Sequence, residues 1–216
     1  MPWWGELIYF IGSWITLFPI LIGLYRLKSL DNKNAVILIW MCSMFAIQLY
    51  SSHQFDLKIN NLPSRHLMVF LNALFGSYFF YHSVKVKFAK NLILFFALPL
   101  LVYLGINPFC FETIHDFNGF SMAVQAYVFM VLSLIYLFSL IEDEQIINLF
   151  QSPEFIIVIA ILFYFGTSQF VQLFQGYVSR HMKEVKFVFR YVDISIMIVY
   201  YLLIGIGLWK TKLQKT

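Results

Sequence analysis

The chain has 216 residues, of which 61% are hydrophobic, 20% aromatic and only 12% charged. A soluble domain of this size cannot hide that much apolar surface in one core, so the composition excludes an ordinary water-soluble protein and predicts a membrane protein. The formal net charge is +4, but the basic residues stand in short links between apolar runs. We therefore expect contacts with the headgroups of the lipid bilayer and no binding of nucleic acid.

Seven apolar runs follow one another along the chain, each close to the roughly 20 residues that a helix needs to cross a bilayer. We expect helices at Leu7–Tyr25, Ala35–Ser52, Leu67–Val84, Asn91–Phe109, Ser121–Ile141, Pro153–Phe174 and Phe189–Trp209. The links between them are too short to form a separate domain. The predicted fold is all-α: a polytopic integral membrane protein with one seven-helix transmembrane domain over residues 1–216.

The basic residues near the helix ends predict the orientation, because lysine and arginine concentrate on the cytoplasmic side of a membrane. One side of the predicted bundle has nine of them: Arg26, Lys28, Lys33, Lys85, Lys87, Lys90, Lys210, Lys212 and Lys215. The other side has six: Lys58, Arg65, Arg180, Lys183, Lys186 and Arg190. We therefore expect the N-terminus outside and the C-terminus in the cytoplasm.

Two prolines, Pro19 and Pro99, lie inside the first and fourth apolar runs. A proline removes one backbone hydrogen bond from a helix, so we expect a bend at each unless neighbouring groups repair the gap. These residues are structural features and not candidate site residues.

Polar side chains that hydrocarbon penalises normally face the interior of a helix bundle or a wet cavity. In this chain they gather in the predicted outer third of the helices. The candidate ligand-binding residues are Gln48, Asn72, Gln125, Gln169, Gln172 and Asp193. Gln169 and Gln172 are three residues apart and so share one helix face. The pattern predicts a polar pocket open to the outside, with Asp193 as its charge and the five amides as hydrogen-bonding groups.

Other interpretations of these residues stay open. Amides also join transmembrane helices through interhelical hydrogen bonds, so the amide set fits a role in helix packing as well. Residues this close to the interface also meet water. Asp193 follows Arg190 by three residues, a spacing that allows a local ion pair.

The sequence offers no catalytic or metal-binding motif. Its five histidines include no HxxxH or HExxH pair, so no zinc ligand set is visible, and no Gly-x-Ser-x-Gly serine is found. The last predicted helix has no lysine before Lys210, which argues against a retinal Schiff base on that helix. We therefore expect neither an enzyme activity nor a metal or cofactor.

The C-terminal part of the chain contains Ser152-Pro153-Glu154-Phe155, the segment FYFGTSQF at residues 163–170, and a final helix with Tyr200-Tyr201 and Trp209-Lys210. Over about residues 150–210 this pattern resembles small bacterial seven-helix membrane proteins of unknown function. Similar membrane regions occur fused to, or encoded beside, sensor histidine kinases. The resemblance implies a sensory input domain in the bacterial inner membrane whose output module is a separate protein, such as a histidine kinase.

The first functional hypothesis is therefore a membrane-embedded sensory module that recognises a ligand in an outward-facing polar pocket and couples to a partner protein. The alternative is a small transporter or channel for a polar solute, whose path would have to cross an inner half made almost entirely of apolar and tyrosine side chains. A lipid-acting membrane enzyme is the third hypothesis. The ligand, the partner and the oligomeric state stay open at this point.

Overall fold

The computed structural model describes residues 3–142, 149–181 and 186–211, and it describes the backbone alone for residues 142, 170, 172, 173, 175–181 and 186. All regular elements in these ranges are helices, which confirms the predicted all-helical class. The α-helices are α1 (Trp3–Trp14), α2 (Leu17–Tyr25), α3 (Asn32–Asp56), α4 (Leu62–Ser83), α5 (Lys87–Cys110), α6 (Gly119–Glu142), α7 (Pro153–His181) and α8 (Lys186–Trp209). Two short 3-10 helices, η1 (Leu27–Ser29) and η2 (Leu149–Gln151), precede α3 and α7.

The seven predicted runs correspond to these helices, with α1 and α2 together covering the first run. The main difference is at the polar ends, as in α3, which extends beyond the predicted Ala35–Ser52 on both sides. Helical hydrogen bonding continues there into polar residues outside the apolar run. At the start of α3 the Asp31 side chain accepts a hydrogen bond from the Asn34 backbone N–H at 3.0 Å, which caps the helix.

The first apolar run is broken between α1 and α2, and Pro19 explains the break. Pro19 has no N–H to donate to the carbonyl of Ile15, four residues earlier. The backbone N–H of Phe18 donates to that carbonyl instead, at 3.0 Å, so the chain makes a tighter turn there. Pro99 behaves differently, because α5 continues through it without interruption.

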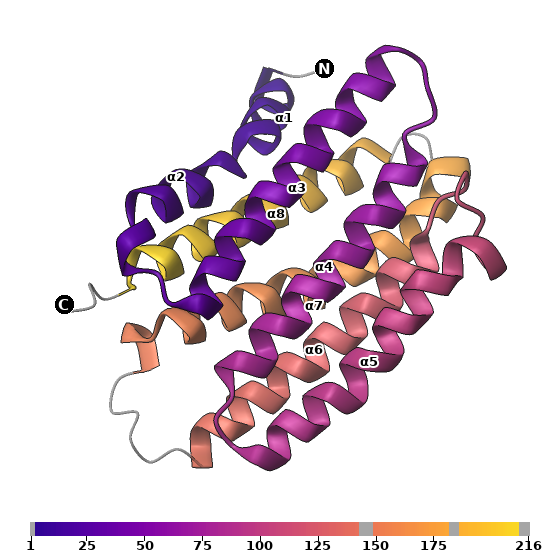
Figure 1. Cartoon of the computed structure of the whole chain (residues 1–216). Helices are drawn as coiled ribbons and strands as arrows, with labels where there is room; N and C mark the ends of the chain where they lie inside the picture. Colours follow the sequence, from indigo (N-terminus) through magenta and orange to yellow (C-terminus); the bar gives the residue numbers. More distant parts are fainter. Residues whose placement is uncertain (1–2, 143–148, 182–185, 212–216) are drawn as a thin grey trace.

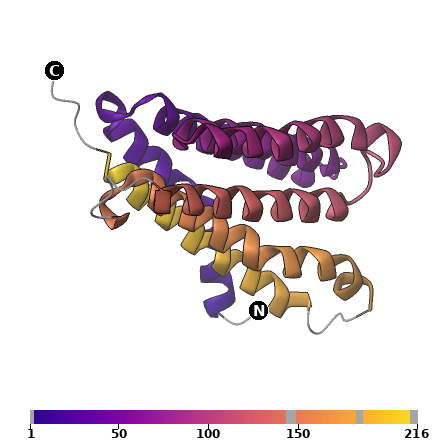
Figure 2. The ribbon, with the colours of Figure 1, turned by 90° about the horizontal axis from the view of Figure 1, so that it is seen from below.

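The helices form a closed bundle in chain order (Figure 1). Each helix from α3 to α8 packs against the next, and the bundle closes because α1 and α2 pack against α8 while α2 also packs against α3. Seen from below, α4 and α5 lie on one side and α7 and α8 on the other, with α6 between them (Figure 2). The two sides diverge toward the end that the sequence predicts to be outside (Figure 2).

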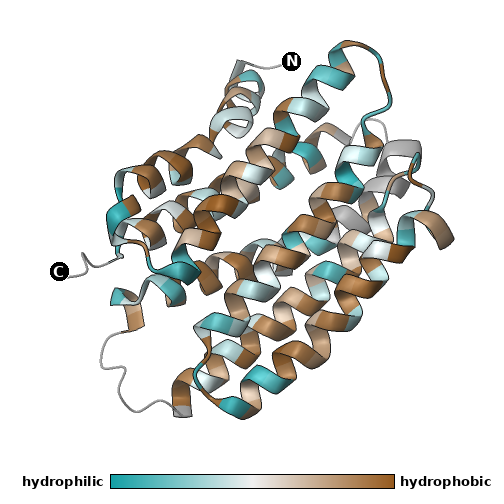
Figure 3. Cartoon of the chain, in the orientation of Figure 1, coloured by the Kyte–Doolittle hydropathy of each residue, from teal (hydrophilic) through white to brown (hydrophobic). Residues whose placement is uncertain are grey.

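The outer surface of the bundle is apolar. Five helical stretches are long and apolar enough to cross a membrane: Trp3–Tyr25, Asn32–Asp56, Lys87–Cys110, Gly119–Ile141 and Phe187–Trp209. Large side chains on them, such as those of Phe95 and Val102 on α5, stand exposed. Apolar residues run along the middle of the helices and polar residues gather near their ends (Figure 3). This distribution is compatible with a multi-pass membrane protein.

Aromatic rings fill the middle of the bundle. Phe129 of α6 is fully buried, and its ring centre lies 4.7 Å from Phe165 of α7, 6.0 Å from Phe80 of α4 and 6.3 Å from Trp40 of α3. Gly76 of α4 makes room for this packing, because a Cβ atom at Gly76 would collide with the Phe129 ring. We call Trp40, Phe80, Phe129 and Phe165 the aromatic layer. Along α3, α4 and α6 it lies between the residues of the two pockets described below, and on α7 Phe165 directly follows Tyr164, which lines the outer pocket.

Candidate functional site

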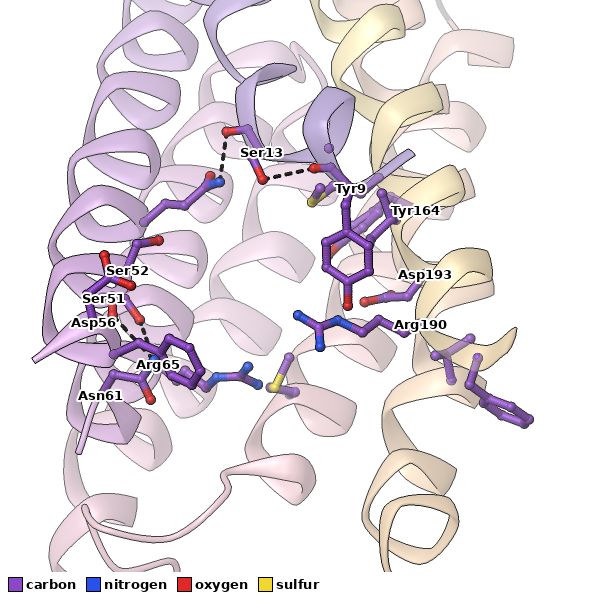
Figure 4. Close-up of a pocket in the computed structure, with 18 residues that line it drawn as sticks. Tyr9, Ser13, Ser51, Ser52, Asp56, Asn61, Arg65, Tyr164, Arg190 and Asp193 are labelled. Atoms are coloured by element: carbon purple, nitrogen blue, oxygen red, sulfur yellow. Dashed lines mark hydrogen bonds between the residues drawn. The ribbon is translucent and has the colours of Figure 1, made fainter. Parts of the chain in front are cut away.

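A pocket of about 700 Å³ lies at the end of the bundle where the two sides diverge. Residues of α1, α3, α4, α6, α7 and α8 line it (Figure 4). We call it the outer pocket, after the predicted orientation. Its described charged residues are Asp56, Arg65, Arg190 and Asp193. A pocket of this size and chemistry is large enough to hold a small charged molecule.

Two of the candidate residues, Asp193 and Gln48, line the outer pocket. Asp193 extends into it from α8, and its Oδ1 atom is buried without a hydrogen-bond donor among the described residues (Figure 4). Gln48 is already engaged: its Nε2 donates to the backbone carbonyl of Ser13 at 3.1 Å, close to the break between α1 and α2. Gln48 therefore holds α3 to α1, whereas Asp193 Oδ1 has no such contact with the described residues.

Asn72 and Gln125 make contacts between helices instead. Trp40 of α3 donates through Nε1 to Asn72 Oδ1 of α4 at 2.6 Å. Gln125 of α6 donates through Nε2 to the carbonyl of Val69 on α4 at 2.8 Å. Neither amide is among the described residues that line the outer pocket. Their geometry agrees with the helix-packing interpretation of the amide set.

Gln169, one of the two candidate amides of α7, is not among the described residues that line the outer pocket. Gln169 is buried, and its Oε1 has no hydrogen-bond donor among the described residues. The side chain of Gln172 lies outside the described residues. The side chains of Arg180 and Lys186, and the whole of Lys183, Lys212 and Lys215, which entered the prediction of orientation, also lie outside them.

Two arginines, Arg65 and Arg190, are pocket residues that the sequence did not place among the candidate site residues: Arg65 entered only the prediction of orientation, and Arg190 was in addition a possible ion-pair partner of Asp193. Arg65 stands in the first turn of α4 and Arg190 in the first turns of α8. Their guanidinium groups extend into the pocket from opposite walls (Figure 4). One sequence signal could have found them: both arginines lie near helix starts at the same predicted end as Asp193.

Each guanidinium lies against an aromatic ring. The Cζ atom of Arg190 is 4.4 Å from the centre of the Tyr9 ring, and that of Arg65 is 5.4 Å from the centre of the Phe117 ring. A cation–π contact of this kind uses none of the hydrogen-bond donors of the guanidinium, so its N–H groups remain available to a ligand.

The local ion pair that the spacing allowed between Arg190 and Asp193 does not form, because their charged atoms are not within 4.0 Å of each other. Arg190 stacks on Tyr9 instead. The electrostatic partner of Asp193 is Arg65, from α4 on the other wall of the pocket. This attraction acts across the cavity and not along one helix.

A second cluster of polar residues, which the sequence did not single out, joins α3 to α7 at the end of the bundle opposite the outer pocket. Lys33 Nζ lies 2.7 Å from Glu154 Oε1, and Asn34 Nδ2 donates to the same oxygen at 3.4 Å. Ser152 donates through Oγ to Glu154 Oε2 at 2.8 Å. We call Lys33, Asn34, Ser152 and Glu154 the inner cluster.

The inner cluster borders a pocket of about 260 Å³, the inner pocket, which Tyr136 and Ser139 of α6 also line. It is much smaller than the outer pocket, and its carboxylate already has partners. The described residues contain no group of three or more histidine, cysteine, aspartate or glutamate side chains that could hold a metal ion.

The chain matches no family model, no curated protein and no solved structure. A functional conclusion therefore has to come from the geometry of the outer pocket.

Proposed function

We propose that the protein is a membrane-embedded sensory module that binds a small charged ligand in the outer pocket and transmits this event to a partner protein. In this proposal the chain sits in the inner membrane of a bacterium, with its N-terminus outside. The partner is a signalling protein such as a histidine kinase, which meets the cytoplasmic face.

One observation carries the proposal: Arg65 and Arg190 extend into one cavity from different helices, and neither has an ion pair within 4.0 Å in the described part of the chain. Charged groups near the membrane are costly and are normally paired, so two free guanidinium groups facing one cavity suggest that a ligand completes them. The orphan oxygen of Asp193 in the same cavity points in the same direction.

Helix α7 offers a route from the pocket to the other face. Its residues Tyr164 and Val171 line the outer pocket, and Glu154 near its start holds the inner cluster together. A ligand that draws α4 and α8 together would shift α7, which packs against α8 and α6. That shift would reach the Lys33–Glu154 ion pair, where a partner on the inner face can read it.

Exposed basic residues lie at the same end as the inner cluster. Lys87 opens α5, and Lys28 lies in η1. In the predicted orientation these side chains face the cytoplasmic leaflet and are placed to contact anionic lipid headgroups. The same surface is available to a partner protein.

A small transporter for a polar solute is the second candidate, and the inner pocket is the observation that favours it. A transporter exposes its site alternately to the two sides, and here the two pockets lie on either side of the aromatic layer. The rings of Trp40, Phe80 and Phe129 are essentially completely buried, so solute passage would require them to move. We rank sensing first because Phe129 packs against the three other rings of this layer, so a solute path would have to break these contacts.

The proposal is tested by ligand binding to the full-length chain in lipid nanodiscs. Amino acids, organic acids, amines and phosphorylated headgroups are added one at a time, and the thermal unfolding midpoint is measured. At least one compound should raise the midpoint of the wild type but not that of Arg65→Gln. If none does so, the outer pocket is not a ligand site for these classes.

A matched control separates the pocket from general charge effects. Lys58→Asn removes one positive charge at the same end, outside the described lining of the pocket, and asparagine tolerates the positive φ of 59° at this position. This variant should keep the full ligand response. Uptake of the binding compound into proteoliposomes would favour transport over sensing.

A further inference from the structure

The described lining of the outer pocket has equal numbers of positive and negative groups, but these groups do not form ion pairs with one another. Its described lining carries two carboxylates, Asp56 and Asp193, and two guanidinium groups, Arg65 and Arg190. No two of these groups lie within 4.0 Å of each other as an ion pair. The described wall is therefore neutral while it presents separate positive and negative groups to the cavity.

The positive part has the geometry of an anion subsite. Both guanidinium groups lie over aromatic rings, of Tyr9 and Phe117, and neither forms an ion pair with a described residue, so their N–H groups remain for the ligand. Arginine edges match carboxylate and phosphate oxygens, with two parallel hydrogen bonds per pair. Two arginines that approach from opposite walls would repel each other in the empty pocket, and an anion between them would remove that repulsion.

The negative part is suited to a cation that can donate hydrogen bonds. Asp193 Oδ1 is buried and has no donor among the described side chains. An oxygen in this state gains most from an N–H group brought by a ligand, because a buried acceptor without a partner loses its hydration. The hydroxyl of Tyr9, which also lines the pocket, is buried and unpartnered as well.

We infer that the ligand is a small zwitterion, with a carboxylate or phosphate for Arg65 and Arg190 and an ammonium group for Asp193. This inference rests on the proposed function of the outer pocket. A simple anion would leave Asp193 without a partner, and a simple amine would leave both arginines without one. A zwitterion satisfies both ends and keeps the pocket neutral.

Apolar side chains complete the site. Met122, Ile194 and Met197 line the same cavity, so a short aliphatic chain between the two charged groups would meet apolar contacts. The same chemistry occurs in free amino acids and in the headgroup of phosphatidylethanolamine. The experiment has to distinguish these two sources.

The test compares matched compounds on the full-length protein in nanodiscs of phosphatidylglycerol. Glycine, β-alanine and γ-aminobutyrate are the zwitterions; acetate, propionate and butyrate carry only the anion; methylamine, ethylamine and propylamine carry only the cation. At least one zwitterion should bind at least about tenfold more tightly than its two matched single-charge compounds, since one further ion pair worth about 1.4 kcal/mol changes affinity tenfold.

Two variants assign the ends of the ligand. Asp193→Asn should abolish the preference for the zwitterion over the anion, and Arg65→Gln should abolish the preference over the amine. Asp116→Asn, in an exposed link of the chain, is the matched acidic control and should change neither preference. Size-exclusion profiles and unfolding midpoints establish that each variant is folded, and Arg190→Gln replaces Arg65→Gln if the latter is not.

The lipid source is tested with glycerophosphoethanolamine and with nanodiscs that contain phosphatidylethanolamine. Stabilisation by these alone, lost in Asp193→Asn, supports the zwitterion inference with a lipid headgroup as the ligand. Binding of the anions or the amines as tightly as the zwitterions overturns the inference but leaves the outer pocket as a ligand site. Binding of none of these compounds overturns the inference, and failure of the wider set of compounds as well overturns the proposed function.

Discussion

The two ends of the bundle use charge in opposite ways. At the inner end Lys33 and Glu154 lie 2.7 Å apart, and Ser152 donates to the same carboxylate, so the charges join α3 to α7. At the outer end Arg65 and Asp193 attract each other across a cavity of about 700 Å³ without forming an ion pair. Paired charges hold helices together, whereas separated charges in a cavity reduce stability and are retained for binding. We therefore propose that charge stabilises the bundle at the inner end and serves ligand recognition at the outer end.

The aromatic layer allows the two ends to differ. Phe129 contacts Trp40, Phe80 and Phe165, so one ring of α6 links α3, α4 and α7 in the middle of the bundle. Along α3 this packing lies between the inner cluster and the residues of the outer pocket. Substitutions at the two ends should therefore act independently, and a substitution in the layer should affect the whole bundle.

The largest effect is expected in the aromatic layer itself, where disruption would remove the separation between the ends. Gly76→Ala places a methyl group against the Phe129 ring and should lower the free energy of unfolding by about 1–3 kcal/mol, as overpacking does. Gly105→Ala is the matched control, because its Cβ would meet only Phe70 at 3.9 Å. Unfolding by SDS titration in mixed micelles measures both. Equal stability of the two variants would contradict the tight packing of the layer.

The next effect is expected at the inner cluster, where it tests whether paired charge stabilises this end. Glu154→Gln should cost about 1–2 kcal/mol, less than the loss for a fully buried pair, because both side chains are partly exposed. Asp31→Asn is the control: Asp31 lies 3.7 Å from the same lysine, is more exposed, and asparagine keeps the helix cap. The same titration measures both, and a double-mutant cycle with Lys33→Met isolates the pair. A coupling energy near zero would mean that the ion pair does not hold α3 to α7.

A smaller effect is expected at the amide contacts between helices, and it separates packing from binding. Asn72→Leu removes the acceptor of the Trp40 N–H group and should cost about 0.6–2 kcal/mol. The affinity for any compound that binds the outer pocket should stay unchanged, because Asn72 is not among its described lining residues. Titration of that compound into the variant measures this affinity. A tenfold or larger loss would return Asn72 to the ligand-binding set.

The smallest effect on stability is expected at the outer pocket. This substitution most directly compares the role of charge at the two ends of the bundle. Arg65→Gln removes one of two guanidinium groups that approach each other in an open cavity, so stability should change by no more than about 0.5 kcal/mol. Lys33→Gln at the inner end removes the same charge from a pair and should cost more. Both are compared by SDS titration. Equal losses would show that the charges of the two ends play the same structural role.

Much of the fold follows from the sequence, because the length of an apolar run is a local property. Each predicted run corresponds to helix in the structure, and Pro19 marks the break between α1 and α2, although Pro99 does not interrupt α5. The polar ends, as at Asn32 and Asp56, could not be placed from apolar character alone, because helices extend past the apolar residues. The orientation in the membrane remains a prediction.

The candidate site was only partly predictable. The predicted depth in the membrane indicated Asp193 and Gln48, and both line the outer pocket. Depth does not indicate, however, which way a helix face points. Asn72 faces Trp40, and Gln125 faces the Val69 carbonyl; both contacts depend on the packing of distant segments. Arg65 was missed because its partner Asp193 lies on another helix, far away in the sequence.

The central claim, that a charged pocket opens outside while the opposite end faces the cytoplasm, has one direct test. Cysteine is introduced at Ser52, which lines the outer pocket, and separately at Lys87, at the opposite end, after Cys42 and Cys110 have been replaced by serine. Intact cells are then treated with a membrane-impermeant maleimide. We expect labelling of Ser52→Cys in intact cells and of Lys87→Cys only after permeabilisation. Labelling of Lys87→Cys alone in intact cells would contradict this account.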